Sequence, residues 1–243
     1  MNNRFLTFEK DKIKLKQIDK KNKKSHAIQT FTAVYYNLNM GGTYYTSCSM
    51  SLEEYIKKYP YFSYRKTVIL IKYVIGLISI LKQKGYGIPF FSLSDFTIVI
   101  MDDNLKPNEK DIDKWLIELD VLNEDTCVND DNVYFFYTNS ENIIAVKDDH
   151  FKYEDISKHN TSRKTLFINH EITKKQKKIH YSCGFSSLGL LVIYVLFKQT
   201  IEWDKLYKVN IEKAIQSLYP LPMYWFLKRC LTIDPSKRYL LYI

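Results

Sequence analysis

The longest apolar segment of the chain runs from Tyr181 to Phe197, and it predicts a buried helix. From Leu188 to Phe197, only Gly189 and Tyr194 interrupt a run of apolar residues. A helix that is apolar on every side must be covered on every side by protein or by lipid. A membrane span needs about 20 apolar residues, and this run is much shorter. We therefore expect this helix at the centre of a globular fold.

Other patterns predict further helices along the chain. Ser51, with Glu54 three positions later, is typical of a capping box and predicts a short helix that stops at Pro60. A long amphipathic segment ends at Gly85, a residue type that commonly follows a helix C-terminus. The expected helices lie between Ser51 and Pro60 and over residues 64–84, 181–197, 210–219 and 222–231.

Strands are expected mainly in the first half of the chain. Residues 4–18 alternate loosely between apolar and charged types, and residues 27–38 are rich in β-branched and aromatic types. This pattern predicts two strands joined by a basic turn, with further strands at 97–100 and 115–119. Few strands at the front and many helices behind indicate an α+β fold weighted to helix.

The composition is that of a globular protein with a sizeable core. Of the 243 residues, 46% are hydrophobic and 15% are aromatic, so we expect one main globular body. The four cysteines lie far apart, which predicts neither a zinc site nor a disulfide framework. The Asn- and Lys-rich start has no apolar block of the secretory type. We expect a cytoplasmic, intracellular protein without a membrane partner.

The formal net charge of +9 is concentrated in two lysine clusters, one at Lys20 to Lys24 and one at Lys174 to Lys178. Such clusters are commonly solvated loops, and they also bind phosphate, nucleic acid or acidic proteins. No nucleic-acid-binding motif accompanies them, so nucleic acid is the less favoured partner.

Two motifs near the C-terminus resemble those of protein kinases. Ser186 to Leu191 reads Ser-Ser-Leu-Gly-Leu-Leu, and Arg229 to Arg238 reads Arg-Cys-Leu-Thr-Ile-Asp-Pro-Ser-Lys-Arg. They are similar to the central helix and to the last arginine motif of the family. Upstream, Glu171 occupies the glutamate position of the family's Ala-Pro-Glu segment. The resemblance implies a buried ion pair between Glu171 and Arg238, which would fasten the activation segment to the lower lobe.

The segment Gly87 to Ile100 is similar to the kinase catalytic loop in its apolar framework and differs from it in its chemical groups. The resemblance places Ser92 where the family has its catalytic aspartate, Ser94 where it has a lysine, and Thr97 where it has the asparagine that holds magnesium. A serine hydroxyl cannot accept the substrate's proton near neutral pH. These degenerate positions predict no catalysis.

The resemblance aligns the family's metal-binding Asp-Phe-Gly motif with Asp120-Val121-Leu122. Leu122 lacks the backbone freedom of glycine, and Asp120 is a weak candidate for a magnesium ligand. Gly184 stands where the central helix of the family has an aspartate that braces the catalytic loop. The aromatic cluster at 134–137 is expected to pack on the lower lobe.

The nucleotide-binding half of a kinase has little counterpart in this sequence. No Gly-x-Gly-x-x-Gly loop and no Val-Ala-Ile-Lys strand is present. We expect residues 1–45 to form vestigial N-lobe strands and a hinge at 35–45, and residues 46–243 to form a kinase-like helical C-lobe. The fold prediction is therefore α+β and kinase-like, mostly the helical C-lobe with a reduced, β-rich N-terminal lobe.

These features predict a pseudokinase that binds protein without a cofactor. It would act as a scaffold, decoy or regulator of an active kinase or of a kinase substrate. The expected partner-binding residues are Lys174, Lys175, Lys177 and Lys178. The alternative is a divergent ATP-dependent Ser/Thr kinase with residual nucleotide and magnesium binding, in which Asp95, Asp102 or Asp120 would hold the metal.

Overall fold

The computed structural model describes residues 4–9, 12–19, 24–32, 42–101, 133–158, 166–202 and 206–240. Contacts divide the chain into two compact units. The sheet unit comprises Met1–Tyr59 and Phe96–Thr138, and the helical unit comprises Pro60–Asp95 and Asn139–Ile243. The strand expected at 115–119, Asp120 and Leu122 lie outside the described residues, as does most of the first lysine cluster.

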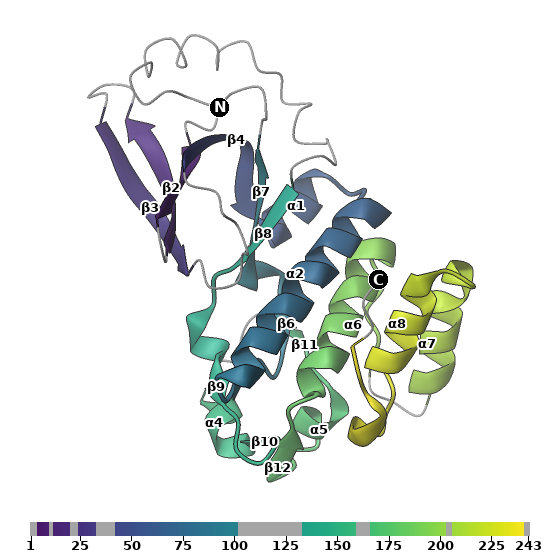
Figure 1. Cartoon of the computed structure of the whole chain (residues 1–243). Coiled ribbons are helices and arrows are strands. Elements are labelled where there is room, and N and C mark those ends of the chain that lie inside the picture. Colours follow the sequence, from purple (N-terminus) through teal and green to yellow (C-terminus); the bar gives the residue numbers. More distant parts are fainter. Residues whose placement is uncertain are drawn as a thin grey trace. The chain divides into compact units, whose positions relative to one another are not determined.

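The sheet unit contains a six-stranded sheet with the order β3-β2-β1-β4-β7-β8 (Figure 1). Every neighbouring pair in it is antiparallel. Its strands are β1 (Arg4–Glu9), β2 (Lys12–Asp19), β3 (Lys24–Thr32), β4 (Gly42–Ser51), β7 (Phe96–Met101) and β8 (Val133–Tyr137).

The N-terminal segment forms three strands, where the sequence pattern predicted two. The stretch expected as one strand over 4–18 is a hairpin, in which β1 and β2 pair from Arg4↔Gln17 to Glu9↔Lys12. A stretch of this length exceeds the usual strand of five or six residues, so folding it back satisfies its backbone groups within the sheet. The second expected strand, over 27–38, corresponds to β3, which begins and ends earlier.

The units do not divide the chain at the expected boundary near residue 45. Strand β4 occupies part of the expected hinge and continues to Ser51, and β7 pairs with it. Strand β8 pairs with β7 in turn, which places the aromatic residues of 134–137 within the sheet. Phe135 and Phe136 are buried. Backbone pairing thus joins β7 and β8 to β4 and the N-terminal strands.

Helix α1 (Leu52–Lys58) follows β4 and begins with the predicted capping box. The backbone N–H of Glu54 donates to Ser51 Oγ at 3.2 Å, and the N–H of Ser51 donates to Glu54 Oε2 at 3.1 Å. The helix ends two residues before Pro60, which confirms the predicted short helix.

The helical unit contains the other predicted helices. The long helix α2 (Tyr64–Gln83) is followed by Gly85, whose φ of 78° lies in the left-handed region. The apolar segment forms α6 (Cys183–Phe197), which is buried along most of its length and packs against α2. These helices are confirmed, and the mixture of helix and strand makes the chain α+β. The other helices in the described part of the chain are α4 (Tyr153–Ser157), α5 (His170–Thr173), α7 (Tyr207–Ile215) and α8 (Pro222–Cys230).

Three two-stranded sheets complete the helical unit. They are β5 (Tyr86–Gly87) with β9 (Ile144–Ala145), β6 (Phe91–Ser92) with β11 (Leu166–Phe167), and β10 (His150–Lys152) with β12 (Lys178–His180). The turn that precedes β10 has Asp148 and Asp149 at φ values of 50° and 59°. Aspartate tolerates this region better than most residues. None of the helices in the described ranges has the length and apolarity that a membrane crossing requires.

Candidate functional site

The segment expected to resemble a catalytic loop is fixed by its aromatic residues. Phe90 and Phe91 are each exposed by 1% or less. Phe90 packs in a core cluster with Phe151 and Ile179, and Phe91 pairs with Phe167 through the β6–β11 sheet. The backbone at this point is therefore held by the core, as the apolar framework of the sequence predicts.

Beyond Phe91 the loop carries hydroxyl groups and one buried carboxylate. Ser92 is buried, and its hydroxyl lies 3.1 Å from the hydroxyl of Ser94. Asp95 has no exposed surface; its Oδ2 accepts from the backbone N–H of Ser92 at 2.7 Å, and its Oδ1 accepts from Asn139 Nδ2 at 2.9 Å. A buried carboxylate is stable only when hydrogen bonds or charges compensate for its lost hydration. Asp95 acts here as an acceptor that holds the loop together.

The central helix supports this loop by a contact that needs no side chain at position 184. A Cβ placed on Gly184 would lie 2.3 Å from the carbonyl oxygen of Ile88, so the two backbones are in close contact at this position. One turn further along α6, Ser187 Oγ accepts from the backbone N–H of Phe91 at 2.7 Å. The Ser187 hydroxyl therefore holds the loop against α6.

Asn139 identifies a second chain segment beside the loop. The segment hydrogen-bonded to the loop here is the one that follows β8, where the sequence reads Thr138-Asn139-Ser140. Strand β8 is also the partner of β7, which follows the loop.

Thr97, the third degenerate position, belongs to the sheet unit. It lies on β7, between Ser51 of β4 and Phe136 of β8, and it is 8% exposed. Thr97 therefore occupies an ordinary position within a strand of the sheet. Within the described residues, no group of three or more His, Cys, Asp and Glu side chains is arranged to hold a metal ion.

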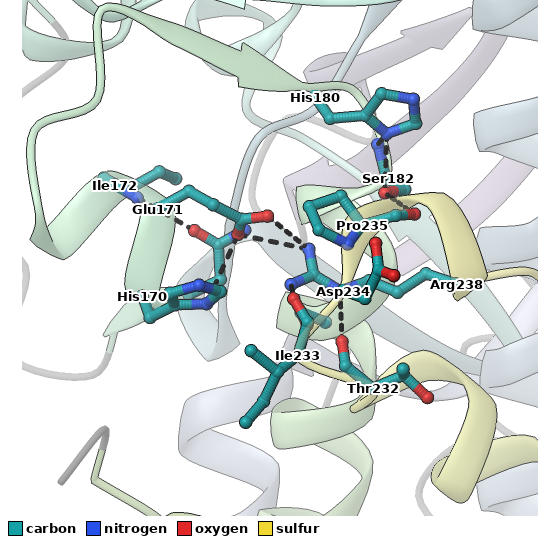
Figure 2. A network of polar contacts seen from close by, with 12 residues as sticks. His170, Glu171, Ile172, His180, Ser182, Thr232, Ile233, Asp234, Pro235 and Arg238 are labelled. Atoms are coloured by element: carbon teal, nitrogen blue, oxygen red, sulfur yellow. Dashed lines mark hydrogen bonds and ion pairs between the residues drawn. The ribbon is translucent and has the colours of Figure 1, made fainter.

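Glu171 and Arg238 are brought together as the sequence predicts (Figure 2). Arg238 Nη1 donates to Glu171 Oε1 at 2.8 Å and to Oε2 at 3.1 Å, and neither side chain is exposed by more than 2%. The rest of the guanidinium donates to backbone carbonyls, from Nε to Thr232 and from Nη2 to Ile233. The pair joins α5 to the segment after α8. These hydrogen bonds compensate for the lost hydration of the two buried charges, as a buried ion pair requires.

Two histidines lie near this pair. His170 Nδ1 is 3.7 Å from Glu171 Oε2, and burial lowers the pKa of His170 although Glu171 acts in the opposite direction. His180 Nδ1 accepts from the backbone N–H of Ser182 at 3.2 Å, and the Ser182 hydroxyl donates to the carbonyl of Pro235 at 3.1 Å (Figure 2). Burial, and then the nearby His150, lower the pKa of His180.

The lysines of the second cluster are exposed. Lys174, Lys175 and Lys177 lie in the turn between α5 and β12, and Lys178 begins β12. Lys175 has a φ of 53°, and the turn is closed by a hydrogen bond from the N–H of Gln176 to the carbonyl of Glu171 at 3.1 Å. The backbone carbonyl of Glu171, the residue whose side chain forms the ion pair, thus fixes the turn that carries the lysines.

Sequence reasoning missed three residues of the site. It weighed Asp95 as a metal ligand and overlooked its role in the loop, and it did not identify Asn139 or Ser187. The partners of Asn139 and Ser187 are 44 and 96 positions away, so no local pattern could reveal them. The one available signal is Asp95 itself, a charged residue within an apolar framework.

Comparisons with known proteins give structural similarity alone. No protein-family model matches the sequence, and no curated protein matches it. The Rad53 kinase domain with SCD2 in complex with AMPPNP has a TM-score of 0.46 at 13% identity, over 98% of this chain and 86% of that one. The Rad53 kinase domain with SCD2 gives 0.48 at 12%, over 97% and 85%. Rad53 1–466 in complex with AMP-PNP gives 0.46 at 11%, over 98% and 62%.

Proposed function

We propose that this chain is a kinase-like protein that does not transfer phosphate and that acts by binding a protein partner. The proposal is supported by the order of the motifs along the sequence and by the buried pair of Glu171 and Arg238. The observation that carries it is the state of the loop, in which Ser92 stands at the position of the catalytic base and bonds to the Ser94 hydroxyl.

The alternative function is phosphoryl transfer by a mechanism that differs from that of known protein kinases. It would need a carboxylate beside the loop, and Asp95 is the one that the described residues offer. A general base must reach the proton that it removes, and a nucleotide-bound metal needs free carboxylate oxygens. Asp95 is fully buried, and each of its oxygens already accepts an N–H. This arrangement favours a binding protein over an enzyme.

Nucleotide-dependent thermal unfolding tests the choice. The purified chain is melted with and without ATP and magnesium, with the same salt and without protein partners. A protein that binds the nucleotide at a hundredfold excess over the dissociation constant gains about 2.7 kcal/mol of stability. We expect no shift in the unfolding temperature. A shift that requires both ATP and the metal, and that Asp95→Asn removes, would favour the enzyme.

A further inference from the structure

The outer face of the β10–β12 ribbon carries basic groups from both strands. Successive residues of a strand point to opposite faces, and directly paired residues share a face. Phe151 and Ile179 are paired and buried, so they turn toward the core. The pairs on either side of them therefore share the outer face; these are His150 with His180, and Lys152 with Lys178.

The two lysines of this face are placed at an electrostatic cost. Lys152 lies directly opposite Lys178, both side chains are exposed, and like charges opposed across a ribbon are destabilising. Within the described ranges, neither lysine forms an ion pair with a carboxylate. Tyr153 donates its N–H to the carbonyl of Lys177 at 3.3 Å, which ties the lysine turn to the same ribbon. An anion bound between the lysines would relieve the repulsion.

Two histidines lie on the same face. Their ring centroids are 5.4 Å apart and the rings are perpendicular within a few degrees. His150 Nδ1 lies 2.6 Å from the carbonyl of Asp148, which favours a proton on Nδ1. Because His180 Nδ1 accepts from Ser182, the neutral ring carries its proton on Nε2. The His180 ring can therefore present an Nε2 donor to an anion.

Other charged groups act on these rings. Burial and then His150 lower the pKa of His180, and the Asp149 carboxylate, which lies 3.9 Å from Lys82 Nζ, acts in the opposite direction. Glu171 and Arg238 act on His180 in opposite directions. The ring of Tyr181 lies 4.8 Å from that of His180. Asp149 and Glu171 thus each lie near a positively charged side chain, and the net charge of the ribbon face stays positive.

We propose that the outer face of the β10–β12 ribbon, formed by His150, Lys152, Lys178 and His180, binds the phosphate group of a phosphorylated protein segment. This inference deepens the proposed function and rests on it, because it names the chemical class of the partner. The first and third residues of each strand are separated by about 7 Å, which matches one phosphate group. Nucleic-acid binding needs a longer track and exposed rings for stacking. The neighbouring Phe151 and Tyr153 pack against the core instead.

A peptide-binding assay on the full chain tests the site. A short synthetic phosphoserine peptide and its unphosphorylated twin are titrated with protein, and binding is followed by fluorescence anisotropy. We expect the phosphorylated peptide to bind at least about tenfold more tightly. The double variant Lys152→Glu/Lys178→Glu should remove this preference. The matched control Lys208→Glu/Lys213→Glu reverses two exposed lysines of α7 and should keep it.

A pH series tests the role of the histidines. The phosphate itself titrates near pH 6, and this effect is common to every protein variant. Between about pH 7.5 and pH 5.5, the affinity of the unmodified protein should rise relative to that of His180→Gln, because the bound anion favours the charged form of the ring. Unchanged relative affinities would remove the histidines from the site and overturn the proposal as stated.

Three other results would also overturn it. They are equal binding of the two peptides, full binding by Lys152→Glu/Lys178→Glu, and tighter binding of a single-stranded oligonucleotide than of the phosphopeptide. Inorganic phosphate at equal concentration should compete weakly, since a protein segment adds contacts beyond the phosphate group. The failures of the two proposals can be told apart. Phosphoryl transfer by the chain would contradict the proposed function alone, whereas absent peptide binding would contradict this inference alone.

Discussion

The Arg238 side chain forms hydrogen bonds to several groups of the fold at once. Its guanidinium donates to both oxygens of Glu171 and to two backbone carbonyls, and it is almost completely buried. Arginine suits this position because its planar group presents several donors in fixed directions. A lysine would supply one ammonium group and leave carbonyls without donors.

Removing this side chain should therefore be costly. Arg238→Ala should lower the free energy of unfolding by about 3–5 kcal/mol, because the Glu171 carboxylate is left buried without its partner. Arg238→Lys should recover part of the loss, and Glu171→Gln should cost less than Arg238→Ala since the amide keeps an oxygen acceptor. Chemical denaturation measures all three. Equal stability of Arg238→Ala and the parent would contradict a buried, compensated pair.

Gly184 provides a second test at the level of one residue. A Cβ at this position would overlap the carbonyl oxygen of Ile88, which belongs to the backbone and cannot move aside easily. Gly184→Ala should destabilise the protein by about 1–3 kcal/mol. The matched control is Gly76→Ala in helix α2, where a Cβ meets no atom within 4 Å. There alanine should stabilise by about 0.5–1 kcal/mol. Thermal unfolding that ranks the two variants in the opposite order would exclude the close contact.

The elements of the helical unit are joined by hydrogen bonds between distant segments. Helix α6 reaches β6 through Ser187, and the segment after β8 reaches the loop through Asn139. Both bonds end on the loop that contains Phe91 and Asp95. They fix the backbone of the loop in one geometry.

Ser187→Ala isolates the contact between α6 and β6. It leaves the buried N–H of Phe91 without this acceptor, which should cost about 1–3 kcal/mol. Ser79→Ala is the control, because the Ser79 hydroxyl bonds within its own helix to the carbonyl of Ile75. Its effect should stay within about 0.5 kcal/mol. Urea denaturation of both variants compares them, and equal effects would mean that Ser187 is no brace.

The β10–β12 ribbon should make stability depend on pH. Burial and His150 lower the pKa of His180 below the ordinary value of about 6.5, so the unfolded chain takes up a proton at a higher pH than the folded protein does. The free energy of unfolding should therefore fall as the pH drops below about 6.5 and stay constant above it. His180→Gln should reduce this dependence in denaturation experiments at several pH values. A dependence of the opposite sign would contradict the burial of the ring.

Across the whole molecule, local signals predicted the helices well and long-range pairing poorly. The capping box at Ser51 and the glycine after α2 mark helix ends within a few residues, so α1 and α2 were predictable. The hairpin of β1 and β2 depends on backbone pairing that hydrophobic alternation does not encode. The strand that pairs with β7 begins at Val133, and the aromatic cluster at 134–137 did not indicate this pairing. Pairing between strands separated by a long segment leaves no local pattern.

The account as a whole depends on the absence of phosphoryl transfer. The most direct measurement is the transfer of labelled phosphate from ATP to a general serine/threonine substrate, and to the chain itself, with magnesium and then with manganese. The account predicts incorporation no greater than that of the Asp95→Ala variant under the same conditions. Incorporation that grows with time, and that Asp95→Ala or Ser92→Ala abolishes while the variant stays folded, would contradict it.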